Sequence, residues 1–183
     1  MNVEVEIRFR IEDSDKCRAQ LLKVSKLIGN KHQVDEYFEH PVRNFTANKE
    51  LKEYLRVRTT GEKSSLDYHK CIIKQNEKSH TEEFESQIQK PEIVKTILLE
   101  LGFKPKVIVD KRRETFETEN LTICFDKIEN LGSFLEVEAK KLVGTVDETK
   151  EACQKFAESL HLNLEKAPEG GYPDLLLAKT NSF

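Results

Sequence analysis

No hydrophobic run in this sequence is long enough to cross a bilayer, and no basic segment followed by an apolar stretch opens the chain. We therefore expect neither a membrane-spanning helix nor a signal peptide. Metal-ligand spacing among cysteines is also missing, because Cys17, Cys71, Cys124 and Cys153 lie far apart. These four residues are expected to be core thiols of a reduced, cytoplasmic protein.

A basic excess is absent as well. Charged residues make up 34% of the chain, yet the formal net charge is only −3. A domain that binds DNA or RNA is usually basic, so nucleic acid is not an expected partner. With 183 residues the chain fits a single domain, residues 1–183. Only 37% of it is hydrophobic, so its many charges need a place besides the outer surface.

What the sequence does contain is a strict alternation over residues 1–11. Positions 3, 5, 7, 9 and 11 are apolar, whereas Glu4, Glu6, Arg8 and Arg10 occupy the positions between them. Successive side chains of a strand point to opposite faces, so this segment predicts a strand with one apolar and one ionic face. A half-buried strand with a solvated polar face has the same pattern, and that interpretation stays open for one strand alone.

The pattern returns along the chain, over segments 54–60, 66–74, 81–88, 107–117, 121–126 and 134–139. Each segment places ionic residues in phase on one face. The in-phase residues are Arg56, Arg58, Lys70, Lys74, Glu83, Glu85, Lys111, Arg113, Asp126, Glu136 and Glu138. The repetition favours a shared ionic surface over a set of unrelated solvated faces.

Three amphipathic helices are predicted, over residues 14–28, from Pro91 to Gly102, and over 147–161. Tight turns at 61–65, 75–80 and 130–132 favour antiparallel strands, about eight in all. If the helices cover the apolar faces, the ionic faces point away from them. We therefore predict an α+β fold in which a closed eight-stranded antiparallel β-barrel has helices packed outside and a wet, charged lumen.

Such a lumen costs stability unless its charges are paired, solvated or bound to a ligand. Acids and bases could neutralise each other, or a polyanion with divalent cations could do so. Mg²⁺ and Mn²⁺ take carboxylate oxygens and keep phosphate oxygens as further ligands, while arginine and lysine bind phosphate. A Glu-x-Glu pair puts two carboxylates on one face about 7 Å apart, close enough to share a metal cluster.

The motifs, taken in order, resemble those of the CYTH domain, the triphosphate tunnel metalloenzymes. Residues 4–8 (EVEIR) resemble the family's Glu-x-Glu-x-Lys signature, with Arg8 in place of the lysine. Segments 55–58 (LRVR), Lys70, 111–113 (KRR), 124–126 (CFD) and 131–138 (LGSFLEVE) resemble its later strands. Residues 171–176 (GYPDLL) resemble its Ser-Tyr-x-Asp-Leu-Leu tail. The length and the Leu-Gly-x-Phe-x-Glu segment are most similar to the class IV adenylyl cyclase branch.

The resemblance implies a triphosphate substrate, Mg²⁺ or Mn²⁺, and a set of site residues. Expected metal ligands are Glu4, Glu6, Glu136 and Glu138, with Asp126 as a third or outer ligand. Expected phosphate-binding residues are Arg8, Arg10, Arg56, Arg58, Lys70, Lys111 and Arg113. Expected catalytic residues are Glu6, Arg8 and Lys111.

Several assignments stay open in the sequence. Glu83 and Glu85 are further ligands or counter-ions, and Tyr37 lines the tunnel mouth or belongs to the core. The activity is that of an adenylyl cyclase, which makes cyclic AMP and pyrophosphate from ATP, or of a triphosphatase acting on thiamine triphosphate, inorganic triphosphate or nucleotides. A third alternative is a non-catalytic polyphosphate-binding module, because Arg8 cannot give up its proton to act as a base. A homodimer is allowed.

Overall fold

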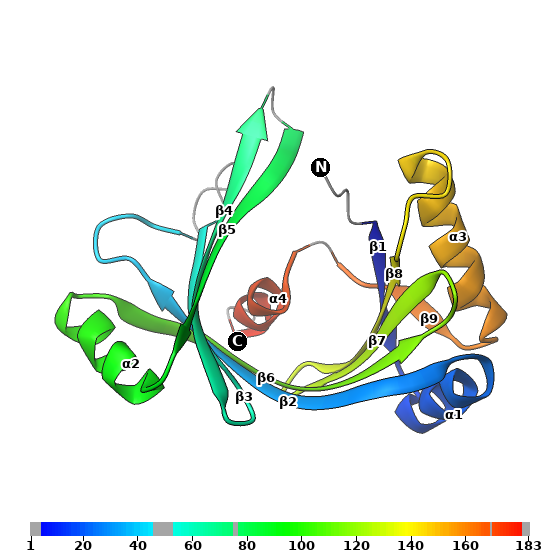
Figure 1. Cartoon of the computed structure of the whole chain (residues 1–183), viewed down its shortest axis with the longest axis horizontal. Coiled ribbons are helices and arrows are strands. Elements are labelled where there is room, and N and C mark those ends of the chain that lie inside the picture. Colours follow the sequence, from blue (N-terminus) through cyan, green and yellow to red (C-terminus); the bar gives the residue numbers. More distant parts are fainter. Residues whose placement is uncertain (1–4, 46–52, 75–76, 169, 181–183) are drawn as a thin grey trace. The chain divides into compact units, whose positions relative to one another are not determined.

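The computed structural model describes residues 5–45, 53–74, 77–168 and 170–180, with the backbone alone for 71–74, 77–81 and 180. Figure 1 labels the elements in chain order. The strands are β1 (Glu6–Ile11), β2 (Lys26–Glu39), β3 (Glu53–Thr60), β4 (Lys63–Lys74), β5 (Glu77–Ile88), β6 (Lys104–Glu117), β7 (Leu121–Ile128), β8 (Gly132–Ala139) and β9 (Leu164–Lys166). The helices are α1 (Ser14–Val24), α2 (Pro91–Glu100), α3 (Val146–Ser159) and α4 (Tyr172–Thr180).

The strands form one sheet in the order β5-β4-β3-β2-β6-β7-β8-β1-β9. The expected antiparallel pairing is confirmed for β1 with β8, β2 with β3, β3 with β4, β4 with β5, β6 with β7, and β7 with β8. The prediction of a closed eight-stranded barrel is wrong, because the described sheet has nine strands and ends at β5 and β9. Closure would require those two strands to pair, and β9 spans three residues that pair only with Phe9–Ile11.

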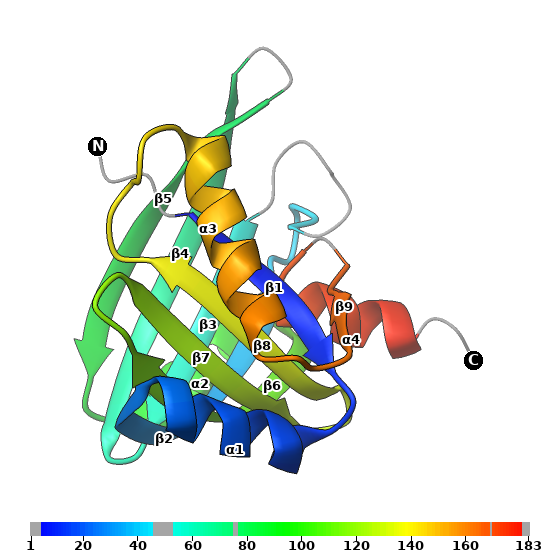
Figure 2. The ribbon, with the colours of Figure 1, turned by 90° about the vertical axis from the view of Figure 1, so that its right-hand side faces the viewer.

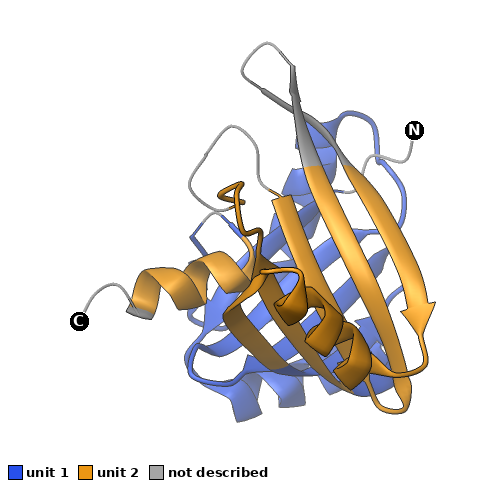
Figure 3. Ribbon diagram, turned by 90° about the vertical axis from the view of Figure 1, so that its left-hand side faces the viewer, with its two compact units in different colours: residues 1–31, 111–170 blue, residues 32–110, 171–183 orange. Residues whose placement is uncertain are grey.

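The chain divides into two compact units (Figure 3). Unit 1 comprises Met1–Lys31 and Lys111–Gly170, and unit 2 comprises His32–Asp110 and Gly171–Phe183. Two strands, β2 and β6, each contribute residues to both units.

Unit 1 has its core on one face of β1, β7 and β8. Phe9, Phe125 and Leu135 come from this face and are almost fully buried. Cys17 and Leu21 of α1 pack in the same cluster, as do Cys153, Ala157 and Leu160 of α3. Figure 2 shows α3 lying across β1 and β8, with α1 along the sheet below. The apolar rows of the sequence are therefore covered by helices, as the amphipathic pattern predicts.

Helix α1 starts where expected and ends earlier than expected. The Asp13 carboxylate accepts a hydrogen bond from the backbone N–H of Lys16 at 2.9 Å, and this contact caps the start of the helix. The predicted end near residue 28 is wrong. Ser25 is extended, and its hydroxyl and backbone N–H both donate to the Leu21 carbonyl. The chain then enters β2 at Lys26, so Leu27 and Ile28 are strand residues.

Unit 2 places α2 over the apolar face of β3. Phe38, Val57 and Leu98 form its buried cluster, with Leu55 and Val94 packed against it. Pro91 occupies the first helical turn, and Gly102 follows the helix with φ +85°, a conformation that glycine adopts without strain. Both ends of α2 match the sequence-based prediction.

Two elements were not predicted. Strand β9 is too short to show a period, and α4 covers a segment for which the sequence analysis gave only the resemblance of residues 171–176 to the family's tail. Strand β5 also begins at Glu77, inside the turn expected at 75–80. None of the described helices is long and apolar enough to cross a membrane.

The unit 1 core yields a first prediction. Leu135→Ala should lower the free energy of unfolding by about 3 kcal/mol, because Leu135 is fully buried and the substitution leaves a cavity. Urea denaturation measures the change. Leu142→Ala is the control, since Leu142 is 46% exposed, and its effect should stay within about 0.5 kcal/mol. Equal effects of the two substitutions would contradict this description of the core.

Candidate functional site: two acid–base clusters

The ionic residues of unit 1 share the sheet face opposite the helix-covered core. The strand register pairs Glu6 with Glu138, Arg8 with Glu136, and Arg113 with Asp126. Glu136 is also the cross-strand partner of Cys124 on β7. Four neighbouring strands thus bring carboxylates and guanidinium groups that are more than 100 residues apart in sequence onto one surface. We call this set, together with Lys111, the unit 1 cluster.

Glu136 is held between two arginines. Arg8 Nε donates to Glu136 Oε1 at 2.8 Å, and Arg113 Nη2 donates to Glu136 Oε2. Arg113 also binds Asp126 through two contacts, Nε to Oδ1 at 2.6 Å and Nη2 to Oδ2 at 2.5 Å. Asp126 is fully buried and Glu136 nearly so. Buried carboxylates are tolerated here because each has a charged hydrogen-bond partner.

The electrostatic environment differs between neighbouring carboxyl groups. Burial raises the pKa of Glu136, but Arg113, Arg8 and Lys111 outweigh it and hold that pKa below its ordinary value. The pKa of Glu6, whose side chain is half exposed, is raised by partial desolvation and by the nearby charges of Glu136 and Glu138. Glu136 is therefore kept ionised by its partners, whereas Glu6 is in a position where a further positive charge would be favourable.

Some of the unit 1 carboxylates are suited to bind a hard divalent cation. Glu6 and Glu138 are cross-strand neighbours and supply the oxygen ligands that Mg²⁺ and Mn²⁺ prefer. The repulsion that raises the Glu6 pKa is what such a cation would relieve. No group of three or more metal-binding side chains occurs among the described residues. Glu4, an expected ligand, lies outside the described residues.

The remaining predicted cations of unit 1 have defined surroundings. Lys111 is buried on the ionic face and lowers the pKa of Glu136. Arg10 donates from Nη2 to the Leu131 carbonyl at 3.1 Å and lies over the Phe134 ring. Cys124 belongs to the ionic face, not to the helix-covered core, and burial raises the pKa of its thiol to about 11.

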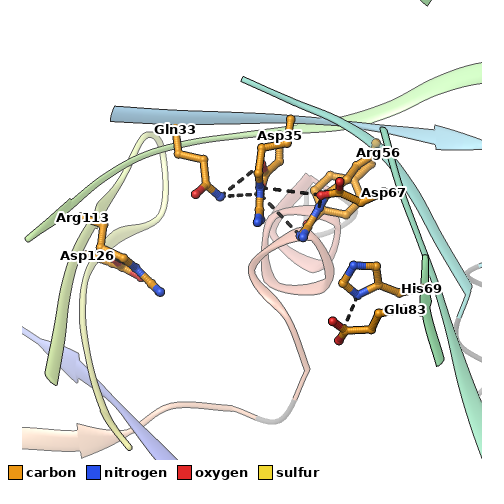
Figure 4. Close-up of polar contacts among 10 residues, drawn as sticks. Gln33, Asp35, Arg56, Asp67, His69, Glu83, Arg113 and Asp126 are labelled. Atoms are coloured by element: carbon orange, nitrogen blue, oxygen red, sulfur yellow. Dashed lines mark hydrogen bonds and ion pairs between the residues drawn. The ribbon is translucent and has the colours of Figure 1, made fainter. Parts of the chain in front are cut away.

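Unit 2 carries a second acid–base cluster, shown in Figure 4. Arg58 binds Asp35 through Nε at 2.7 Å and Nη2 at 2.8 Å. Arg56 Nε donates to Asp67 Oδ2 at 2.9 Å, and its Nη1 donates to the Tyr37 hydroxyl at 3.2 Å. The register explains the arrangement, because Asp35 pairs with Arg58 and Arg56 pairs with Asp67. We call Asp35, Arg56, Arg58 and Asp67 the unit 2 cluster.

Lys70 is not brought together with these arginines. Its Cα partner is Glu53, which places Lys70 on the face of Leu55 and Val57. His69 occupies the ionic face instead, with Nδ1 at 3.5 Å from Glu83 Oε1. Burial and the charge of Arg56 lower the pKa of His69, which favours its neutral form.

Other predicted residues of unit 2 are placed as follows. Glu83 and Glu85 lie on the ionic face and are exposed. Tyr37 is buried, and burial raises the pKa of its hydroxyl. Sequence analysis missed Asp35, Asp67 and His69. Asp67 and His69 alternate with Leu66 and Tyr68, and that phase is the signal that could have identified them.

Fold and clusters together define an α+β protein whose antiparallel sheet is covered by helices on its apolar face and carries paired acids and bases on the other. The chain belongs to the CYTH domain family, whose model matches residues 2–169. Members of this family are divalent-metal-dependent enzymes that process triphosphates, as adenylyl cyclases or as triphosphatases.

Individual relatives agree with this assignment. A Methanocaldococcus jannaschii protein named "Putative adenylate cyclase" is 34% identical over 166 residues, which cover 90% of this chain and 91% of that protein. The structure of a Pyrococcus horikoshii protein, PH1012, has a TM-score of 0.71 and 28% identity, covering 94% of this chain and 99% of the other. A Hippeastrum adenylyl cyclase homologue, described as having a dominant triphosphatase activity, has a TM-score of 0.66 and 16% identity, with 97% and 96% covered. At that identity the likeness concerns the fold alone.

The raised pKa of Glu6 predicts a stability effect. The ionised carboxylate is disfavoured in the folded state, so wild type is penalised above its folded pKa and not below the ordinary value of 4.5. Glu6→Gln should therefore melt at a higher temperature than wild type at pH 7 in EDTA, and the difference should shrink as the pH falls toward 4. Thermal unfolding monitored by circular dichroism measures it. Glu119→Gln, at an exposed position, should show no such difference. A Glu6→Gln variant less stable than wild type at pH 7 would contradict the description.

Proposed function

We propose that this protein is a class IV adenylyl cyclase that converts ATP to cyclic AMP and pyrophosphate with Mg²⁺ or Mn²⁺. The observation that carries the proposal is the unit 1 cluster, in which neighbouring strands present carboxylates suited to a cation next to cations suited to phosphate. The Methanocaldococcus relative, with its printed name, supports the choice of cyclase within the family.

The carboxylates divide into two roles. Glu6 and Glu138 would hold the metal ion, together with Glu4. A bound divalent cation supplies positive charge to phosphate oxygens. Glu136 and Asp126 were expected as ligands too, but both are engaged by arginines. In the proposal these two carboxylates mainly fix the guanidinium groups of Arg8 and Arg113.

The cations stabilise charge on the phosphates. Arg8, Lys111 and Arg113 line the same face as the proposed metal ligands, and Arg113 retains N–H groups beyond those bound to Asp126 and Glu136. Preorganised donors of this kind stabilise the charge that develops on a transferred phosphoryl group. Arg56 and Arg58 of unit 2 are assigned as further phosphate-binding residues, and Arg10 as a peripheral one.

The reaction constrains the role of Arg8. The ribose 3′-oxygen attacks the α-phosphorus, the bond from that phosphorus to the bridging oxygen breaks, and pyrophosphate leaves. The 3′-hydroxyl proton must pass to a base. Arg8 cannot be that base, because its guanidinium does not deprotonate in proteins and already donates to Glu136 and to the Gly170 carbonyl at 2.8 Å.

A triphosphatase is the second candidate. In that reaction water attacks the terminal phosphorus, the bond from that phosphorus to the bridging oxygen breaks, the diphosphate leaves, and inorganic phosphate is formed. The Hippeastrum protein, which shares the fold, favours keeping it in the test. A non-catalytic binding module is the third candidate and follows from Arg8 at the position where the signature has lysine.

Product analysis distinguishes the three. Wild type incubated with ATP and Mn²⁺ should release cyclic AMP and pyrophosphate, separated by chromatography. Glu136→Gln should lower kcat/KM at least about a hundredfold, because Arg8 and Arg113 lose a shared anionic partner and reorient. Glu114→Gln is the matched control. It removes a carboxylate bound to Arg18 on the opposite sheet face and should leave activity unchanged.

Each other outcome has a meaning. Inorganic phosphate without cyclic AMP would overturn the cyclase proposal in favour of a triphosphatase. A rise in melting temperature with Mn²⁺ and inorganic triphosphate, without turnover, would support a binding module. Full activity of Glu136→Gln would show that the unit 1 cluster is not the reacting site.

Position 8 generates a separate prediction. Arg8→Lys keeps the positive charge but cannot donate to both Glu136 and Gly170 with the geometry of a guanidinium. Loss of one charge-assisted hydrogen bond should lower the rate of cyclic AMP formation about tenfold or more. Chromatography of the same reaction shows whether phosphate release rises. An unchanged cyclic AMP rate would show that the pair of contacts from Arg8 to Glu136 and to the Gly170 carbonyl is not needed.

A further inference from the structure

The unit 2 cluster is layered by exposure. The side chains of Asp35 and Asp67 are only 3% and 1% exposed, whereas those of Arg58 and Arg56 are 27% and 14% exposed. The aspartates therefore lie beneath the guanidinium groups that they bind. Three adjacent strands supply the layers, with Asp35 on β2, both arginines on β3 and Asp67 on β4.

Each arginine has a different principal partner. Arg58 is bound by both oxygens of Asp35, and Gln33 Nε2 donates to the same two oxygens at 3.1 and 2.9 Å. Arg56 is bound through Nε by Asp67 and through Nη1 by the Tyr37 hydroxyl. The carboxylates thus fix the planes of two guanidinium groups that are two residues apart on one strand and on the same face.

The buried ion pairs of the unit 2 cluster are not expected to add much to the stability of the fold. Buried ion pairs are often no better for stability than apolar residues of the same size, because desolvation offsets the attraction. Asp67 adds to that cost, since its Oδ1 atom is buried without a hydrogen-bond partner among the described residues. Two aspartates also cancel the charge of the two arginines that were expected to attract phosphate.

We propose that Asp35 and Asp67 are positioning residues that hold Arg58 and Arg56 in a fixed orientation for binding the phosphate groups of the substrate. This inference rests on the proposed function of the arginines. The contacts above occupy Arg58 Nε and Nη2 and Arg56 Nε and Nη1. Arg58 Nη1 lies on the edge of its guanidinium opposite the one that binds Asp35, so it points away from that carboxylate. Arg56 Nη1 also lies 3.6 Å from Asp35 Oδ2, and Arg56 Nη2 makes none of these contacts. Arg58 Nη1 and Arg56 Nη2 are the donors that we assign to the ligand. Fixed donors bind an anion with less loss of conformational entropy than mobile ones.

Kinetics test the proposal. In Asp35→Asn and Asp67→Asn, KM for ATP with Mn²⁺ should rise about tenfold while kcat changes by less than about threefold, because binding and not chemistry loses preorganisation. Asp67→Asn keeps an oxygen for the Arg56 Nε–H and places its amide nitrogen where Oδ1 has no hydrogen bond, so the shape of the site is kept although one buried charge is lost. The melting temperature of each variant is measured together with KM. Glu36→Gln is the matched control. It removes a carboxylate from β2 on the opposite face, where Glu36 binds Lys95, and should leave KM unchanged.

A double-mutant cycle separates positioning from a general loss of stability. If Asp35 acts through Arg58, Arg58→Lys should raise KM, and adding Asp35→Asn to it should raise KM less than about twofold further. Independent, multiplying effects would overturn the proposal, as would KM changes that only follow a fall in melting temperature.

A second measurement does not depend on the enzymatic reaction. In ¹⁵N NMR of wild type, the Nε–H signals of Arg56 and Arg58 should be ordered and slow to exchange. Asp35→Asn should make the Arg58 signal mobile, and Asp67→Asn the Arg56 signal. Unchanged order would overturn the proposal even if the protein turned over no ATP, whereas absence of turnover by wild type with the expected NMR changes would contradict only the proposed function.

Discussion

Strand alternation is the constraint on which the rest of the structure depends. In unit 1, Phe9, Phe125 and Leu135 point toward α1 and α3, and the apolar residues of those helices pack against them in one cluster. Once these residues are fixed, the residues between them have only the other face available. A one-residue shift of register would move the apolar side chains out and the charges into the core, so the core and the ionic face are specified together. Charged residues in phase with a well-packed core are therefore forced into contact with one another.

Contact between so many charges makes each cluster a coupled unit. Glu136 shares Arg113 with Asp126 and also binds Arg8, so removing any member leaves the others partly unpaired. Unpaired charges at buried positions cost several kcal/mol each, and such residues show non-additive effects. This is why substitutions that keep the shape, such as glutamate to glutamine, are more informative here than truncation to alanine. The same coupling explains why Glu6 and Glu136, both on one face, have pKa values shifted in opposite directions.

The sequence was sufficient for local features and insufficient for pairing. Alternation placed Arg8, Arg113 and Glu136 on one face. The predicted start of α1 was right, and Pro91 and Gly102 located both ends of α2. The sequence alone could not show that Glu136 is bound by arginines from two other strands, because the register between distant strands is set by tertiary packing. The prediction of a closed sheet was wrong for the same reason, because closure depends on pairing between the two terminal strands.

Lys70 shows a different limit. It was assigned to the ionic face because it is basic and shares its phase with Lys74, whereas its neighbour His69 has that position in the structure. The prediction followed residue type instead of phase. Because side chains alternate between the two faces of a strand, an error of one position assigns a residue to the wrong face. Asp35 and Asp67 were also missed as site residues, and their pairing with Arg58 and Arg56 depends on the register between strands.

Arginine at position 8 is best understood through its geometry. A lysine ammonium is a point charge that can turn toward any partner, whereas a guanidinium donates along fixed directions in one plane. Arg8 uses two of these directions for Glu136 and the Gly170 carbonyl, and its own backbone carbonyl accepts from the N–H of Ala167 at 2.9 Å. Position 8 therefore ties β1 to a carboxylate of β8 and to the segment that follows β9. A residue with so many structural contacts is suited to hold a charge in place, and the transfer of a proton at this site must fall to another group.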